Sequence, residues 1–104
     1  MSVEIVHNPE LSRYEARLDG EVVGLAEYRL VGERITLTHT EVNPEHEGKG
    51  IASQLAEVAL ADVKERGFEL IPRCSFMAAY VRSHPDRYLE LVPEALRDRV
   101  MSGR

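Results

Sequence analysis

The sequence is poor in cysteine and has no long apolar run, and both absences bear on where the protein works. Its 104 residues include one cysteine, Cys74, so no intramolecular disulfide can form. A lone thiol suits a reducing cytosol. The N-terminal sequence MSVEIVHNPE lacks the basic and apolar regions of a signal peptide, and no apolar stretch approaches a membrane span. We therefore expect a cytoplasmic protein with no membrane partner.

Basic segments and metal-ligand patterns are also missing. The formal net charge is −5 and no window is strongly basic, which argues against a nucleic-acid partner. A single anion can still be held by backbone N–H groups at a local site. Cys74, His39, His46 and His84 lack the spacing of a metal centre, so we expect no metal.

The length of the sequence predicts one domain, residues 1–104, with one core. Its first part alternates apolar and polar residues in four segments, as half-buried strands do. Turn residues separate them, including Asp19-Gly20, a strong hairpin signal. The predicted strands, which would form an antiparallel meander, are Val3–His7, Arg13–Leu18, Val22–Leu30 and Ile35–Val42.

After residue 43 the apolar period changes to that of a helix. An amphipathic helix is predicted from about Gly50 to Arg66, and Gly67 is placed to end it. Phe68–Ile71 is a short apolar run and is predicted to be the fifth strand. Strand, helix and strand then form a parallel β-α-β crossover. The fold class is therefore α/β (α+β): a mixed sheet, an antiparallel β-meander followed by a β-α-β crossover and a C-terminal helix.

The C-terminal part predicts helices and short elements. Ser75 is predicted to cap a helix that runs to about Ser83, and His84-Pro85 is predicted to end it. The segments Tyr88–Val92 and Glu94–Val100 are predicted as short closing elements.

The segment Glu47–Ser53 is a glycine-rich turn between a strand and a helix. Free N–H groups and the dipole at a helix N-terminus favour an anion, and glycine lets the backbone approach it. Lys49 adds a cation, while Ala52 and Ser53 leave the approach open. The spacing is neither that of a P-loop nor that of GxGxxG. The alternative is that Gly48 and Gly50 serve only to reverse the chain.

The segment Ile35–Arg66 resembles motif A of the GNAT superfamily of acyl-CoA-dependent N-acetyltransferases. There a fourth strand leads to a [Q/R]-x-x-G-x-[G/A] turn whose amides hold the CoA pyrophosphate. Gly50 and Ala52 match the two small positions, whereas Glu47 departs from the leading Gln/Arg. The resemblance implies acetyl-CoA or CoA as the cofactor. The residues it implies for binding are Thr40, Glu41, Val42, Gly48, Lys49, Gly50, Ile51, Ala52 and Ser53.

Nearly the whole chain also resembles the short, single-domain YjdJ-like family of GNAT-like proteins. The shared runs are His39-Thr40-Glu41-Val42, Pro72-Arg73-Cys74-Ser75-Phe76 with Tyr80, and His84-Pro85. Members of that family bind CoA or acetyl-CoA. The helices that typical GNAT members place between the first two strands are absent, which implies a more open acceptor site.

The resemblance places His39, Glu41 and Cys74 at one cleft, where the fourth and fifth strands splay apart. His39 is the first candidate for the general base, and Glu41 is the alternative; either could instead be structural or solvated. Simple alternation puts Ile35, Leu37, His39 and Glu41 on one face of the strand. A β-bulge near Thr40 would change that facing.

Cys74 has two candidate catalytic roles and one structural one. It could accept the acyl group as a nucleophile, or lie beside the CoA sulfur as a proton donor, or simply pack. Tyr80 could protonate the leaving thiolate or pack in the core.

The sequence thus predicts an acetyl-CoA-dependent N-acetyltransferase whose acceptor is an amine of a small molecule or a protein. Two other functions stay open: a non-catalytic CoA or acyl-CoA binding module, and a protein-interaction domain without a cofactor. The oligomeric state is not predicted.

Overall fold

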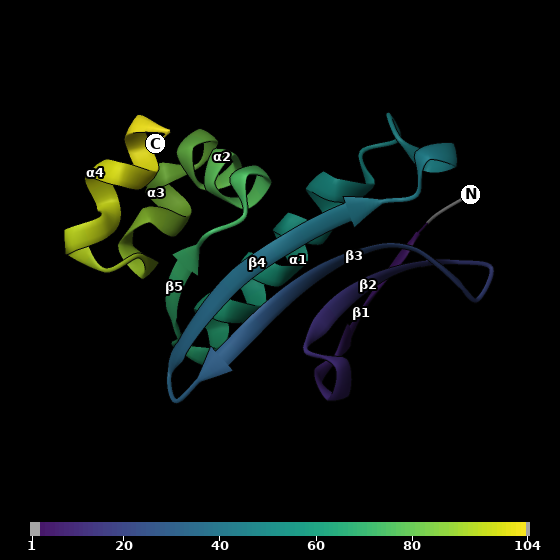
Figure 1. Cartoon of the computed structure of the whole chain (residues 1–104), viewed down its shortest axis with the longest axis horizontal. Helices are drawn as coiled ribbons and strands as arrows, with labels where there is room; N and C mark the ends of the chain where they lie inside the picture. Colours follow the sequence, from purple (N-terminus) through teal and green to yellow (C-terminus); the bar gives the residue numbers. More distant parts are fainter. Residues whose placement is uncertain (1–2, 104) are drawn as a thin grey trace.

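A computed structural model describes residues 3–103. Five strands form one sheet in the order β1-β2-β3-β4-β5, with helix α1 against one face and the remaining helices beside β5 (Figure 1). The strands are β1 Glu4–Asn8, β2 Arg13–Leu18, β3 Glu21–Val31, β4 Arg34–Val42 and β5 Glu69–Pro72. The α-helices are α1 Ile51–Arg66, α2 Ser75–Ser83, α3 Pro85–Tyr88 and α4 Glu94–Ser102.

The first four strands form the predicted antiparallel meander. Asp19 and Gly20 both have positive φ, 53° and 81°, in the tight turn between β2 and β3. Such turns match the right-handed twist of the strands they join. The mixed α/β fold class predicted from the sequence is confirmed.

The crossover from β4 through α1 to β5 is parallel, as predicted. Helix α1 buries Leu55, Ala59, Leu60 and other small and aliphatic residues completely against the sheet. Gly67 ends the helix with φ of 72°, and its N–H group bonds the carbonyl of Lys64. The core therefore lies between α1 and one face of the sheet.

Strand β4 contains a β-bulge at Thr38. The register pairs Leu37 with Tyr28 and His39 with Glu27, so Thr38 has no opposite residue in β3. The extra residue reverses the facing of everything after it. Leu37 is buried in the core, whereas His39 and Glu41 are exposed. The prediction that Ile35, Leu37, His39 and Glu41 share a face is wrong. The strand contains a β-bulge, which the sequence analysis gave as the alternative to simple alternation.

The C-terminal helices differ from the sequence prediction in two details. Helix α2 ends at Ser83 as predicted, but Cys74 and not Ser75 is its N-cap. Pro85 begins a new helix, α3, rather than only ending the previous one. A 3₁₀ turn, Leu89–Leu91, follows, and α4 then packs against α2. Proline fits the first position of a helix because its missing N–H group would have no partner there.

A polar network ties the C-terminal end of α1 to the meander. Tyr14 donates a hydrogen bond to Asp62 at 2.6 Å, and Arg66 bonds the same carboxylate. His7 stacks on Tyr14 and lies 2.7 Å from the Tyr28 hydroxyl. Burial, followed by the bond from Tyr14 to Asp62, raises the pKa of Tyr14 well above its usual value.

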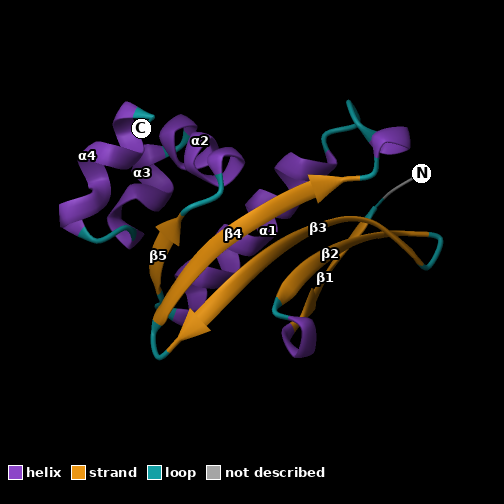
Figure 2. Cartoon of the chain, viewed as in Figure 1, coloured by secondary structure: helices purple, strands orange, loops and turns teal. Residues whose placement is uncertain are grey.

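The sheet face opposite α1 carries no helix over β1–β4 in the described part of the chain (Figure 2). Glu15 lies on this face and is nevertheless 2% exposed, because Arg13 and Arg17 cover it. The bond from Arg17, helped by Arg13 and Asn8 and opposed by burial, lowers the pKa of Glu15 to about 2. Among residues 3–103, no helix has the length and apolar character that crossing a bilayer requires.

Candidate functional site

Strands β4 and β5 separate partway along β4. Their parallel pairing runs from Arg34–Glu69 to Leu37–Pro72 and then stops, while β4 continues to Val42. One more bond, from the Cys74 N–H group to the Leu37 carbonyl at 2.8 Å, joins the two segments. The edge of β4 that faces away from β3 is therefore free of β5 beyond this point. We call the divergence between this edge of β4 and the N-terminus of α2, two elements in contact, the slot.

Cys74 spans this slot. Its thiol donates a hydrogen bond to the Thr40 hydroxyl at 3.3 Å, and the side chain is half-buried. Cys74 is also the N-cap residue of α2, so the thiol sits at the start of that helix. Thr40, which the sequence placed among cofactor-binding residues, is thus the contact of the candidate catalytic cysteine.

His39 lies on the other side of the same strand. Its Nε2 atom is 3.3 Å from a carboxylate oxygen of Glu41, and both side chains are more than half exposed. His39 and Glu41 therefore form a pair on the open face of the sheet, while Thr40 turns toward Cys74. The structure brings Cys74 together with Thr40, and it brings His39 together with Glu41.

The glycine-rich turn lines an open hollow of about 260 Å³. Gly48 and Gly50 have φ of 81° and 77°, which only glycine adopts without cost. A Cβ atom at either position would meet no protein atom within 4 Å, so both glycines face open space. The other residues of the hollow are Val42, His46, Glu47, Ile51, Ala52 and Ser53.

The first turn of α1 offers free backbone donors to this hollow. Gly50 is the N-cap, no side chain caps the helix, and the first turn has no acidic residue. The N–H groups of Ile51, Ala52 and Ser53 precede the first intrahelical bond, which Gln54 donates to the Gly50 carbonyl. Such N–H groups, with the helix dipole, bind phosphate. The shape and the donors fit a pyrophosphate.

Two residues of opposite charge lie at the glycine-rich turn: Glu47 lines the hollow, and Lys49 lies between the lining residues Gly48 and Gly50 in the chain. Lys49 is exposed, and its ammonium group lies 3.2 Å from His46 Nδ1. The Glu47 side chain is exposed as well. An exposed carboxylate can turn to solvent, so Glu47 does not close the hollow to an anion.

Gly24 on β3 is a positioning residue that the sequence did not reveal. A Cβ atom there would lie 3.2 Å from the Glu41 carbonyl and 3.3 Å from the Ile51 side chain. The glycine lets β3 and β4 approach the first turn of α1, so it sets the position of the hollow. A glycine in the middle of an alternating strand was the available signal.

Two tyrosines lie where α2 meets α3, Tyr80 on α2 and Tyr88 at the end of α3. Tyr80 is half-buried and packs on His84, with ring centroids 4.5 Å apart. Burial, together with Tyr88 and Glu57, raises the pKa of Tyr80, which keeps its hydroxyl protonated. The Tyr88 hydroxyl is buried without a hydrogen-bond partner among the described residues.

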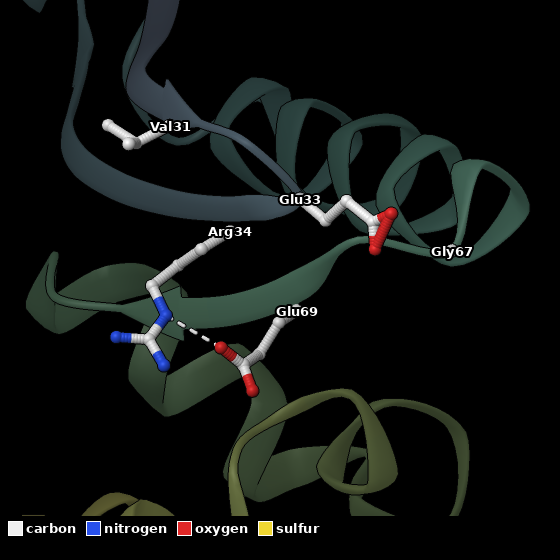
Figure 3. Close-up of a pocket in the computed structure, with 5 residues that line it drawn as sticks. All are labelled: Val31, Glu33, Arg34, Gly67 and Glu69. Atoms are coloured by element: carbon white, nitrogen blue, oxygen red, sulfur yellow. Dashed lines mark hydrogen bonds and ion pairs between the residues drawn. The ribbon is translucent and has the colours of Figure 1, made fainter.

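A second hollow lies at the far end of β4. Figure 3 shows Arg34 and Glu69 across it, joined by an ion pair at 2.6 Å. This hollow lies at the start of β4, whereas the glycine-rich turn follows its end. Its lining contains no cysteine or histidine, so it is not the candidate site. Residues 3–103 contain no group of three His, Cys, Asp or Glu side chains arranged to hold a metal ion.

The chain is similar to known proteins of one family. Residues 13–91 match the model of a family described as GCN5-related N-acetyl-transferase. Protein NATD1 from Gallus gallus is 37% identical over 93 residues, which cover 85% of this chain and 83% of that protein. The Homo sapiens protein of that name is also 37% identical over 93 residues, covering 85% and 80%.

A solved structure is similar as well. It is a ribosomal-protein-alanine N-acetyltransferase from Brucella melitensis biovar Abortus 2308, with a TM-score of 0.54 and 29% sequence identity. The match covers 60% of this chain and 49% of that one, so the matched part corresponds to about half of that enzyme.

Proposed function

Because the chain belongs to the GCN5-related N-acetyltransferase family, we propose that it transfers an acetyl group from acetyl-CoA to an amine. The observation that carries the proposal is the hollow at the N-terminus of α1, next to the slot beside β4. A pyrophosphate in the hollow would place the pantetheine arm along the free edge of β4. The thioester would then lie near Cys74.

Bound acetyl-CoA supplies the activated acyl group as a thioester. The amine nitrogen forms a bond to the acyl carbon, the bond from that carbon to sulfur breaks, and the thiolate leaves. One proton must leave the amine and one must reach the sulfur. The chain's task is to bind both substrates and to hold groups for these two protons.

Cys74 is the group we place at the leaving sulfur, as a proton donor. Its thiol already donates to the Thr40 hydroxyl, which fixes the direction of the side chain. A nucleophilic cysteine needs a base within hydrogen-bond reach, and His39 turns to the other face of β4. The geometry therefore favours proton donation over a covalent acyl intermediate. Tyr80, whose raised pKa keeps it protonated, is a second donor on the same helix.

His39 is the group we place at the attacking amine. The contact of Nε2 with Glu41 favours a proton on Nε2, which leaves Nδ1 as an acceptor. Because the open face of the sheet carries no helix over this strand, an amine can approach His39 directly (Figure 2). Glu41 orients the ring and stabilises the imidazolium.

A CoA-binding module without efficient transfer is the second candidate. The separation of His39 and Cys74 onto different faces of β4 favours it, because no pair of groups forms a relay. Both candidates require the hollow to bind CoA, and only the first requires turnover.

A thermal melt tests the shared requirement. Acetyl-CoA at a hundred times its dissociation constant should stabilise the fold by about 2.7 kcal/mol, raising the melting temperature by about ten degrees or more. Gly50→Asn puts a side chain into the hollow and should abolish the shift. Gly32→Asn is the matched control, because Gly32 also has positive φ and open space around it but lies in the turn before β4. Asparagine tolerates positive φ, so both variants should fold.

Three results are decisive. A shift in the wild type and in Gly32→Asn, but not in Gly50→Asn, supports the hollow as the cofactor site. No shift in the wild type contradicts both candidates. A shift with no release of free CoA thiol in the presence of any amine leaves the binding module.

A further inference from the structure

A cavity lies beside the slot, between the end of β5, α2 and α4. Its volume is about 500 Å³, within the range of small-molecule sites. The floor is apolar and includes Ile71, Pro72 and Leu96. In Figure 1, α2 and α4 lie side by side beyond the end of β5, and the contacts between the two helices agree. Such a floor would pack the carbon skeleton of an organic ligand.

The charge of this cavity is the opposite of the charge of the chain. Arg73, Arg82 and Arg99 line it, and no aspartate or glutamate does. The chain as a whole carries −5. Three guanidinium groups and no carboxylate make the cavity locally electropositive. Such a lining favours a negatively charged ligand.

These arginines also lack carboxylate partners within residues 3–103. Arg82 donates one bond, to the Val100 carbonyl at 3.1 Å, and Arg73 and Arg99 are exposed. Other arginines of the sheet have carboxylate partners: Arg17 pairs with Glu15, and Arg34 pairs with Glu69. The cavity arginines keep donors available, and guanidinium forks match carboxylates in a bidentate geometry.

The cavity adjoins the slot. Arg73 and Ser75, which flank Cys74 in the chain, are both part of its wall. Ile71 pairs with Thr36 and lies two residues after Glu69, so the two side chains share one face of β5. That face is the one opposite α1. His39 and Glu41 are exposed on that same face. Through Ile71, the arginine-lined cavity thus reaches the sheet face that carries His39 and Glu41.

We propose that this cavity binds the acceptor, and that the acceptor is a small amine that also carries a carboxylate, like an amino acid. The inference rests on the proposed function, because it names the acceptor of the same transfer. The carboxylate lies among Arg73, Arg82 and Arg99, the apolar part lies over Ile71 and Leu96, and the amine points toward His39 and Glu41.

Matched substrates test the charge selection. The probes are L-leucine and L-phenylalanine, each paired with its carboxamide, and the readout is the initial rate of CoA thiol release. The carboxamide keeps the amine and the side chain but lacks the negative charge, and its amine is less basic and thus more often deprotonated. We expect kcat/KM to be at least ten-fold higher for the amino acids than for the amides.

Charge-reversal variants locate the selection. Arg99→Glu and Arg73→Glu, both at exposed side chains, should each raise KM for the amino acid at least ten-fold. The acetyl-CoA-induced melting shift should stay unchanged in both variants. Arg29→Glu is the control, because Arg29 is exposed on β3 outside the cavity and the charge change is the same. It should leave KM within two-fold.

The outcomes separate this inference from the function on which it rests. Equal or faster reaction of the amides, or no effect of Arg99→Glu and Arg73→Glu, overturns the cavity as the acceptor site while acetyl-CoA binding stands. Failure of all four amines to react, with a normal melting shift, also overturns it. A loss of the melting shift in the wild type overturns the transferase itself.

Discussion

At the scale of single residues, the candidate site depends on one contact between two segments that are far apart in the sequence. The Cys74 thiol and the Thr40 hydroxyl meet across the slot at 3.3 Å. Thr40 can reach the thiol only because the bulge at Thr38 turns it away from the open face. A strand without the bulge would have sent His39 toward Cys74 instead.

This contact predicts that substitutions of Cys74 and Thr40 lower kcat to different extents. Cys74→Ala should lower kcat at least ten-fold, since the leaving thiolate loses its proton donor, and should leave acetyl-CoA binding unchanged. Thr40→Val should lower kcat less, about three- to ten-fold, because the thiol keeps its proton but loses its direction. Steady-state kinetics with melting shifts measure both quantities.

Conservative variants provide the control. Thr40→Ser keeps a hydroxyl and should restore kcat to near the wild-type value. An acetyl group found on Cys74 by intact mass, after incubation with acetyl-CoA, would contradict proton donation and point to a covalent intermediate.

The sequence revealed some of these residues and not others. Gly50 was visible because glycine spacing at a strand-to-helix junction is a local signal. The partnership of Cys74 with Thr40 was not, because it depends on the extra residue in β4, which simple alternation cannot detect. The arginine cavity was missed because Arg73, Arg82 and Arg99 come from separate elements that meet only through the packing of α2 and α4.

At the scale of elements, the position of α1 is set by a close approach at Gly24. The added Cβ of an alanine would crowd the Glu41 carbonyl and the Ile51 side chain, at 3.2 and 3.3 Å. Backbone atoms of β4 cannot yield easily, so the first turn of α1 would shift. The hollow that would bind the pyrophosphate begins at that turn.

Gly24→Ala should therefore weaken both the fold and cofactor binding. We expect a loss of about 1–3 kcal/mol in the free energy of unfolding, as for overpacked core positions. The acetyl-CoA-induced melting shift should also be reduced by at least half. Urea unfolding and the ligand melt measure the two effects, and a destabilised variant with the full ligand shift would show that Gly24 serves only packing.

Elements with a long and regular pattern were predicted correctly from the sequence. The four meander strands and α1 each have enough residues for a period to show. Helix α3, Pro85–Tyr88, was not predicted, because four residues hold little more than one helical turn and Pro85 was interpreted as an end.

At the scale of the whole molecule, the polar network at the end of α1 makes stability depend on pH. Burial, then the nearby Arg66 charge, lowers the pKa of His7, with Asp62 opposing them. The unfolded chain therefore binds a proton more readily than the folded one as pH falls below about 6.5. This contribution to stability is present above that pH and is lost below it.

The wild type should thus lose stability between about pH 7 and pH 5, by about 1 kcal/mol or less for this partly exposed group. His7→Gln should flatten that part of the profile. His46→Gln, in the exposed loop before α1, is the matched control and should keep the wild-type slope. Denaturant midpoints measured from pH 5 to 8 decide, and equal slopes in all three proteins would exclude His7 as the cause.

The strand order β1-β2-β3-β4-β5 has a consequence for how the molecule assembles. Each strand is hydrogen-bonded to the strand next to it in the chain, and only the β4–β5 pair must close a long loop that contains α1. Local pairings form faster than distant ones, so the meander can assemble while the crossover is still open. The slot, the hollow and the arginine cavity all depend on segments at or after that crossover. A folding intermediate arrested before the crossover would hold most of the sheet and none of the binding surfaces.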